Sequence, residues 1–235
     1  MSIPGGTSET QTSHFALMDR IYRHQRHIYD LTRRHYLAGR DRLIEGINAA
    51  PGDRILEVGC GTARNLIKIA RRYPGTQLWG LDASSEMLRS AAHSVQHAGL
   101  EKRIMLAHGL AEEVPSIFAG QAGFDHLLFS YSLSMIGDWQ AALRAATQVA
   151  KGHGQIHLVD FGDLNGLWPP AAAGLRHWLG LFHVSPRSDL VQHLENFAHD
   201  RRECSIELLR GRYAFVFKAS IGVVSDFARQ VAIQH

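Results

Sequence analysis

A short glycine turn between an apolar run and a helical pattern constrains the fold of this chain more than any other feature. The apolar run, Arg54–Val58, has the pattern of a buried strand, and the turn is Gly59-Cys60-Gly61. Glycines let the backbone turn sharply and approach a ligand without a Cβ in the way. A helix is expected directly afterwards, over Arg64–Tyr73. This order predicts a strand–helix unit whose turn contacts a ligand.

The rest of the chain alternates strands and helices at similar lengths. Further strands are expected over Gln77–Leu81, Ile104–Ala107, Asp125–Ser130 and Gln155–Asp160, and helices over Ser84–His97 and Trp139–Ala150. Such alternation implies right-handed crossovers and a parallel sheet. The end of the chain differs, because Ile206–Leu209 and Tyr213–Lys218 flank a tight turn at Arg210–Arg212. This pattern predicts a β-hairpin, with an antiparallel strand at or near the sheet edge.

The segments on either side of this α/β domain, which we place at residues 49–220, have other patterns. Residues 1–13 are polar and are predicted to form a disordered tail. Residues 14–48 carry apolar positions spaced near 3.6, which predicts a helical lid from His14 to Asn48 that the Pro51-Gly52 turn stops. Residues 221–235 are expected to form a C-terminal extension.

Composition excludes several classes of protein. Apolar residues make up 45% and charged residues 20% of the 235 positions, as in a soluble globular domain. No apolar run reaches the roughly 20 residues that span a bilayer, so no transmembrane segment is expected. The two cysteines cannot form a disulfide framework, which favours the cytoplasm. The net charge of +3 is not gathered in a basic stripe, so a nucleic-acid partner is not expected.

A carboxylate after the second strand indicates which ligand the turn holds. Asp82 follows the glycine turn by about 20 residues, where a carboxylate accepts both hydroxyls of a ribose. A dinucleotide fingerprint would need Gly at position 64, where this chain has Arg64. Glu57, two residues before the first Gly, suits a cofactor with an amino-acid ammonium group better than it suits a pyrophosphate. The pattern favours a nucleoside cofactor with an amino-acid part.

These motifs resemble those of the class I S-adenosylmethionine-dependent methyltransferases, whose first motif is an acidic residue followed by x-Gly-x-Gly. The resemblance implies a Rossmann-like, mostly parallel seven-stranded sheet with helices on both faces, a C-terminal antiparallel hairpin and an N-terminal helical lid. It implies S-adenosylmethionine as cofactor, S-adenosylhomocysteine as product and no metal. The cofactor contacts that it implies are Arg40, Glu57, Gly59, Gly61, Thr62, Asn65, Asp82, Ala83, Met87, Leu110, Ala111 and Ser130. Leu110 departs from the Asp that the family often has there, so the adenine hydrogen bond is expected from the backbone of Leu110 or Ala111.

Three less common stretches bear on the methyl acceptor. Residues 29–42, 130–136 and 182–187 look like those of the bacterial betaine-lipid methyltransferases. That resemblance implies an N-methyltransferase that converts diacylglyceryl-homoserine to its trimethylated form in three successive steps. A phosphatidylethanolamine N-methyltransferase and a methyltransferase for a small metabolite stay open as alternatives. A protein of another class, which binds S-adenosylmethionine without catalysis, would show no turnover on any lipid or amine.

The chemistry of methyl transfer to an amine suggests residues for the acceptor end. Positive charge persists from the sulfonium to the product, and the amine must lose a proton, so aromatic faces and a proton acceptor are expected. We expect Tyr29, Tyr131 and His183 to be catalytic residues. The homoserine carboxylate would bind an Arg fork, and the predicted substrate-binding residues are Arg33, Tyr36 and Arg187. The spaced histidine pairs lack a third clustered ligand, so no metal site is expected.

A two-chain lipid substrate has to be met at the membrane. The oligomeric state is not predicted by the sequence, but peripheral docking on the inner membrane face is expected. Residues 20–42 are rich in Arg, and Trp168–Phe182 is apolar enough to contact lipid. A lid and a helix that covers the sheet are the alternative interpretations of these two stretches.

Overall fold

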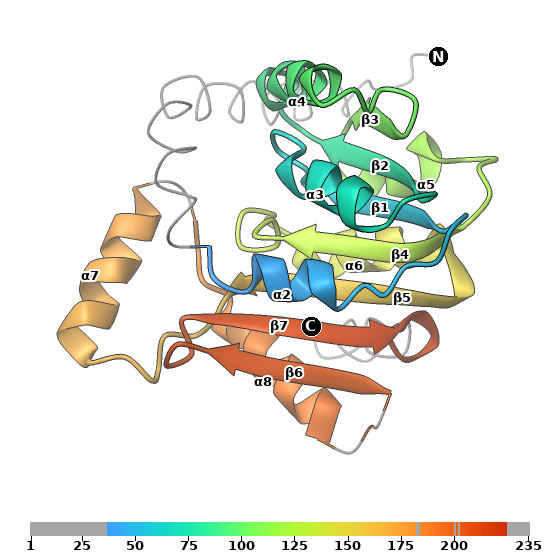
Figure 1. Ribbon diagram of the computed structural model, residues 1–235. Helices are drawn as coiled ribbons and strands as arrows, with labels where there is room; N and C mark the ends of the chain where they lie inside the picture. The colour runs from blue at the N-terminus through green and yellow to red at the C-terminus, as the bar shows by residue number, and fades with distance from the viewer. Residues whose placement is uncertain (1–36, 182–183, 200, 202, 225–235) are drawn as a thin grey trace, which may run out of the picture.

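A seven-stranded sheet forms the centre of the molecule in the computed structural model, which describes residues 37–181, 184–199, 201 and 203–224 (Figure 1). The strands are β1 (Arg54–Val58), β2 (Gln77–Asp82), β3 (Ile104–His108), β4 (Phe124–Ser130), β5 (Ala150–Phe161), β6 (Cys204–Leu209) and β7 (Ala214–Ser220). Their order across the sheet is β3-β2-β1-β4-β5-β7-β6. The helical elements are α2 (Arg40–Glu45), α3 (Arg64–Arg72), α4 (Ser85–His97), η1 (Ala111–Glu113), α5 (Val114–Ile117), α6 (Trp139–Gln148), α7 (Pro169–Gly180) and α8 (Ser188–His199).

The predicted fold class is confirmed. Strands β1 to β5 pair in parallel, and β7 runs antiparallel between β5 and β6. The predicted hairpin is therefore present, and its turn at Arg210, Gly211 and Arg212 has φ angles of 47°, 64° and 64°. The strand order reverses at β1, so the carboxyl ends of β1 and β4 border a crevice where ligands bind in open α/β sheets.

Apolar side chains cover both faces of the sheet, as expected of strands buried on two sides. One face packs against buried residues of α5, α6 and α8. The other packs against α2, α3, α4 and the end of α7. Helix α7 leaves the sheet beyond the carboxyl ends of the strands, where it stands apart from the other helices (Figure 1). Within the described ranges, no helix is both long and apolar enough to cross a membrane.

The structure corrects the predicted N-terminal helix. A continuous helix from His14 to Asn48 is wrong, because Gly39 has a φ of +85° and the helix starts only at Arg40. A Cβ on Gly39 would lie 2.7 Å from Leu209 Cδ1, so the chain crosses the β6–β7 hairpin there with no room for a side chain. The predicted tail and residues 14–36 of the lid lie outside the described residues.

Other boundaries also differ. Helix α6 ends at Gln148 instead of Ala150, and β5 begins at once, running through Gly152 and Gly154. Helix α8 was not predicted at all, although its apolar positions Leu190, Val191, Leu194 and Phe197 are buried in one face of the core. In the expected C-terminal extension, Ile221 and Val224 are also buried in that core, while residues 225–235 lie outside the described part.

Candidate functional site

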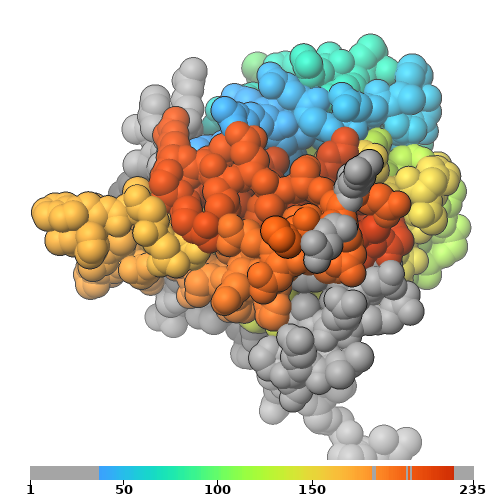
Figure 2. All heavy atoms as spheres, turned by 90° about the horizontal axis from the view of Figure 1, so that it is seen from below, coloured from blue at the N-terminus to red at the C-terminus, as the bar shows by residue number. Residues whose placement is uncertain are grey.

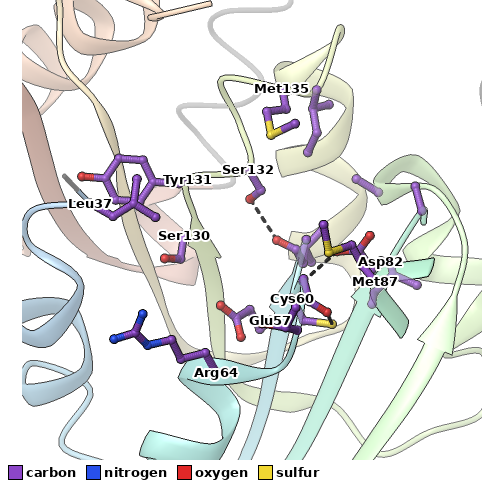
Figure 3. Close-up of a pocket in the computed structure, with 18 of the residues that line it drawn as sticks. Leu37, Glu57, Cys60, Arg64, Asp82, Met87, Ser130, Tyr131, Ser132 and Met135 are labelled. Carbon is purple, nitrogen blue, oxygen red and sulfur yellow. Dashed lines mark hydrogen bonds between the residues drawn. The ribbon is translucent and has the colours of Figure 1, made fainter. Parts of the chain in front are cut away.

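A pocket opens at the carboxyl ends of β1, β2 and β4, where the sequence places the glycine turn (Figure 3). Its empty volume, with the open mouth included, is about 920 Å³. The lining residues come from the segment before α2, the glycine turn, the ends of β2 and β4 and the loops that follow them. They are Leu37, Arg40, Glu57, Val58, Gly59, Cys60, Gly61, Thr62, Arg64, Leu81, Asp82, Ala83, Met87, Gly109, Ala111, Ser130, Tyr131, Ser132, Met135 and Ile136.

The glycine turn has the backbone shape that its sequence predicts. Gly59, Gly61 and Ala63 all have left-handed φ angles, of 77°, 54° and 60°. A Cβ on Gly59 would lie 2.5 Å from Ser132 Cβ, so the loop after β4 passes directly over this glycine. Ser132 Oγ donates to the carbonyl of Val58 at 2.9 Å and holds the two loops together. The turn is therefore fixed from the side that faces the pocket.

Asp82 connects the glycine turn to the start of α4. One of its carboxylate oxygens accepts the Gly61 N–H at 2.7 Å, and the other accepts the Ser84 N–H at 2.9 Å. Ser84 in turn caps α4 by accepting the Met87 N–H. A carboxylate has about four acceptor positions, and these two backbone bonds use two of them. Its position agrees with the predicted ribose contact.

Glu57 places a second carboxylate in the pocket, on the side of β1 away from Asp82 (Figure 3). Its side chain is 1% exposed, and one oxygen accepts a hydrogen bond from Asn65 Nδ2 at 2.6 Å. The other oxygen is buried and has no hydrogen-bond partner among the residues that the structure describes. Burial raises the pKa of Glu57 to about 7, although the Asn65 hydrogen bond and the nearby charge of Arg40 oppose that shift. A buried carboxylate with one open oxygen suits a ligand ammonium group.

Two guanidinium groups line the same end of the pocket. Arg40 belongs to the first turn of α2, and Arg64 to the first turn of α3. Arg fork geometry suits a carboxylate, so this end can hold both charges of an amino acid, the ammonium at Glu57 and the carboxylate at Arg40. The sequence predicts no ligand contact for Arg64, and the structure places it in the pocket.

Apolar residues also line the pocket beside Asp82. They are Ala83, Met87 and Ala111, and Met87 is the residue that the sequence places by the adenine. Leu110 does not line the pocket, and its N–H donates to the Glu113 carboxylate at 2.8 Å. The Leu110 carbonyl accepts the Glu113 N–H at 3.1 Å, so both backbone groups of Leu110 take part in starting η1. The adenine amino group needs an acceptor, and the predicted contact with the backbone of Leu110 or Ala111 stays a prediction, with only Ala111 lining the pocket.

Tyr131 lines the pocket on the side away from Asp82 and Met87 (Figure 3). It has a φ of 56°, its ring packs edge-to-face on Phe161, and its hydroxyl donates to the carbonyl of Ala38 at 2.6 Å. Burial raises the pKa of Tyr131 well above its usual range. The phenol is therefore neutral, and its hydroxyl ties the segment before α2 to the end of β4.

The loop after β4 is held by contacts from three other parts of the chain. Asp160, at the end of β5, accepts the Ser134 N–H at 3.0 Å, and burial raises its pKa to about 6. The Ser185 N–H donates to the carbonyl of Ser134 at 3.1 Å. Arg187 Nη2 donates to the carbonyl of Ile136 at 2.6 Å. With the Tyr131–Ala38 bond, these contacts bring together the described parts of the three stretches that the sequence singles out, near positions 38, 131–136 and 185–187.

Arg187 has a different place from the one expected. It does not line the pocket, and its guanidinium caps two carbonyls at the end of the β4 loop. The structure therefore gives it a role in holding the loop, and a role in binding a substrate carboxylate stays an unsupported prediction. Four further predicted residues, Tyr29, Arg33, Tyr36 and His183, lie outside the described residues.

The pocket brings together most of the predicted cofactor residues. Arg40, Glu57, Gly59, Gly61, Thr62, Asp82, Ala83, Met87, Ala111 and Ser130 line it, and Asn65 supports it through Glu57. The lining residues that the sequence did not predict as site residues are Leu37, Val58, Cys60, Arg64, Leu81, Gly109, Ser132, Met135 and Ile136. Residues 132–136 belong to a stretch already noted as unusual, which was the available signal. Across the residues that the structure describes, no three His, Cys, Asp or Glu side chains form a group that could hold a metal.

Comparison with known proteins matches residues 55–154 to the methyltransferase domain family. The demethylmenaquinone methyltransferase of Bacillus cytotoxicus is 32% identical over 120 residues, which cover 51% of this chain and 49% of that protein. The ubiquinone/menaquinone biosynthesis C-methyltransferase of Geotalea daltonii is 28% identical over 139 residues, covering 57% of this chain and 58% of that protein. The chain thus spans about half the length of these relatives.

Solved structures show the same fold. A SAM-dependent methyltransferase from Aquifex aeolicus superposes with a TM-score of 0.58 at 16% identity, covering 80% of this chain and 93% of that one. The YcgJ protein from Bacillus subtilis gives a TM-score of 0.55 at 22% identity, covering 73% of this chain and 70% of that one. The described part of the chain has the class I methyltransferase fold, and its glycine turn, Glu57 and Asp82 lie inside the matched domain.

Proposed function

We propose that this chain, whose residues 55–154 form a methyltransferase domain, is an S-adenosylmethionine-dependent methyltransferase that acts on a lipid acceptor. One observation carries the cofactor assignment. The glycine turn, the half-satisfied Glu57 carboxylate and Asp82 converge on a single pocket at the strand-order reversal of the sheet. Such a pocket fits a ligand with a ribose at one place and an amino-acid ammonium at another.

The chain's own residues would hold and orient the cofactor. When bound, S-adenosylmethionine supplies a methyl group on a positively charged sulfur. Asp82 would accept the ribose hydroxyls, Glu57 the ammonium and Arg40 the carboxylate of the methionine part. The buried apolar residues Val58 and Leu81 exclude water from the floor of the site. Most of the acceleration in a direct displacement comes from such positioning and desolvation.

The acceptor that we propose is the amine of diacylglyceryl-homoserine, methylated three times in succession. Three segments carry the resemblance to betaine-lipid enzymes, and their described parts are hydrogen-bonded to one another through the β4 loop. Leu37, Met135 and Ile136 make that end of the pocket apolar. An apolar wall with one aromatic ring, Tyr131, suits a headgroup whose nitrogen becomes a quaternary ammonium.

The proton of the acceptor amine needs a destination. Tyr131 does not supply it, because its neutral phenol donates to Ala38. Burial also raises the pKa of the Cys60 thiol well above its usual value, so a thiolate is not formed there. We therefore propose that, in the described part of the site, solvent water at the open mouth of the pocket takes the proton. His183 stays the sequence-based candidate for the proton acceptor.

A second acceptor class is favoured by a specific observation. The relatives from Bacillus cytotoxicus and Geotalea daltonii are named for methylation of menaquinone or ubiquinone precursors. A quinone precursor is also an amphiphile, and an apolar pocket wall would suit its ring. This candidate differs in chemistry, because the methyl group would join a carbon and only once.

Transfer of labelled methyl to separated lipids tests the acceptor. The purified full chain is incubated with labelled S-adenosylmethionine and vesicles that contain diacylglyceryl-homoserine, phosphatidylethanolamine or a demethylated menaquinone. We expect label in mono-, di- and trimethylated homoserine lipid. Label on phosphatidylethanolamine or on the quinone alone would overturn the headgroup assignment and keep the methyltransferase. If no lipid is labelled although S-adenosylhomocysteine binds, a small-metabolite acceptor replaces the lipid.

A further inference from the structure

Helix α7 projects from the body of the molecule beyond the carboxyl ends of the strands, and forms the extension at the left of Figure 2. In the described part of the chain, two large apolar side chains are exposed, and they sit at the two ends of this helix. Trp168 precedes its first residue and is 73% exposed, and Leu181 follows its last residue and is 61% exposed. Exposed large apolar groups on one projecting element indicate an interaction surface.

The stretch of sequence that contains α7 carries charges of one sign. No acidic residue occurs between Asp163 and Asp189, while Arg176 and His177 on the helix are exposed. The β6–β7 turn adds another exposed cation, Arg210. This turn lies next to the segment that leads into α7, since a Cβ on Gly166 would be 2.7 Å from the carbonyl oxygen of Gly211. The surface is therefore apolar at its ends and cationic at its side.

The inner face of α7 is continuous with the pocket. Leu179 is buried, and Leu175 and Trp178 are half-buried in the same apolar cluster as Leu37 and Tyr131, which line the pocket. A partner that binds the outer face of α7 would therefore lie close to the end of the pocket where we propose that the acceptor binds.

We propose that α7 docks the protein on an anionic phospholipid bilayer. Trp168 and Leu181 enter the boundary between headgroups and acyl chains, where an indole ring is favoured. Arg176 and Arg210 face the anionic headgroups, which attract cations close to the surface. Apart from Arg176 and His177, the exposed positions of α7 are Pro, Ala or Gly, among them Pro170, and do not offer the large interdigitating apolar side chains of a protein interface core. A bilayer, which needs no shape complementarity, is the partner that this surface fits.

Vesicle co-sedimentation of the full chain, without cofactor or acceptor, tests the proposal. Because no turnover is measured, the result is independent of the proposed function. We expect binding to phosphatidylglycerol vesicles that is stronger than binding to phosphatidylcholine vesicles and that weakens with salt. The double variant Trp168→Ser with Leu181→Ser should bind phosphatidylglycerol at least about tenfold more weakly, because it loses two inserted side chains.

Matched variants separate docking from general charge and from folding. Arg210→Gln should reduce binding to phosphatidylglycerol vesicles by several-fold, whereas Arg71→Gln, an exposed Arg at the end of α3, should leave it unchanged. All variants should keep the melting temperature and the S-adenosylhomocysteine affinity of the wild type. Equal vesicle binding by the double variant would overturn the proposal. A wild-type dimer that the double substitution splits, seen by light scattering, would also overturn it and assign the surface to a second copy.

Discussion

Replacing Glu57 by Gln is expected to stabilise the free protein while weakening cofactor binding. The buried carboxylate accepts one hydrogen bond, from Asn65, and its other oxygen has no partner in the described part of the chain. Burial moves its pKa from 4.5 to about 7, which corresponds to about 3 kcal/mol of lost stability once the group is ionised. Because the folded-state pKa is raised, this stability is present below pH 4.5 and is lost as the pH rises through 7.

The size of the effect follows from these contacts. In Glu57→Gln the amide oxygen can still accept from Asn65, but the new NH2 group takes the unpartnered place, at a cost of about 1 kcal/mol. The free energy of unfolding at pH 8 should therefore rise by about 2 kcal/mol, which raises the melting temperature of a chain of this length by roughly 4–8 °C. Near pH 5 the two proteins should melt at similar temperatures, since the wild-type carboxyl is then protonated.

Binding should change in the opposite direction. The S-adenosylhomocysteine ammonium loses its charge-assisted partner in Glu57→Gln, so calorimetry at pH 8 should show an affinity at least about tenfold lower. The wild-type affinity should fall below pH 7, as Glu57 takes up a proton, and the variant should lack this dependence. Glu112→Gln, which removes an exposed carboxylate on η1, is the control and should change neither quantity. The expectation is wrong if Glu57→Gln melts at a lower temperature than the wild type at pH 8, or if it binds S-adenosylhomocysteine as tightly.

Three further outcomes are expected. Asp82→Ala should lower the affinity for S-adenosylhomocysteine by tenfold or more. It should also lower the free energy of unfolding by about 2–4 kcal/mol, because two backbone N–H groups lose their acceptor. Unchanged binding by calorimetry and an unchanged melting temperature would remove Asp82 from the site. Tyr131→Phe should lower the free energy of unfolding by about 1 kcal/mol, because the hydrogen bond to the Ala38 carbonyl is lost. It should lower kcat by less than about tenfold. A decrease in kcat of a hundredfold or more in steady-state assays would make the Tyr131 hydroxyl catalytic. Burial lowers the pKa of His157, so the free energy of unfolding should fall as the pH drops below 6.5. In denaturant titrations, the unfolding free energy of His157→Gln should fall by about 2 kcal/mol less than that of the wild type between pH 7 and pH 5. Equal decreases in the two proteins would contradict this.

The cofactor half of the site was predictable because local sequence specifies it. The glycine turn follows a buried strand directly, and its left-handed residues need no distant partner to be recognised. Asp82 ends the neighbouring parallel strand, so the pairing of β1 with β2 alone brings it to the turn. The same holds for the hairpin, whose turn and flanking strands are contiguous in the chain.

The acceptor half depends on contacts between residues far apart in sequence, which no local pattern encodes. Arg187 has the residue type and the setting of a carboxylate ligand, but its guanidinium reaches the carbonyls of the β4 loop instead. Gly39 lies in an apolar periodicity that suggests a continuous helix, yet the β6–β7 hairpin leaves no room for a Cβ there, and the chain bends. Tyr131 was recognised as a site residue, but its bond to Ala38 could only be seen in three dimensions.

A crystal structure of the chain with S-adenosylhomocysteine tests most directly the claim that the glycine turn, Glu57 and Asp82 form one cofactor site. We expect ribose hydroxyls within hydrogen-bond distance of Asp82, the ammonium at the open oxygen of Glu57 and the adenine beside Met87 and Ala111. Density for the ligand in any other place, or an ammonium that points away from Glu57 into solvent, would contradict it.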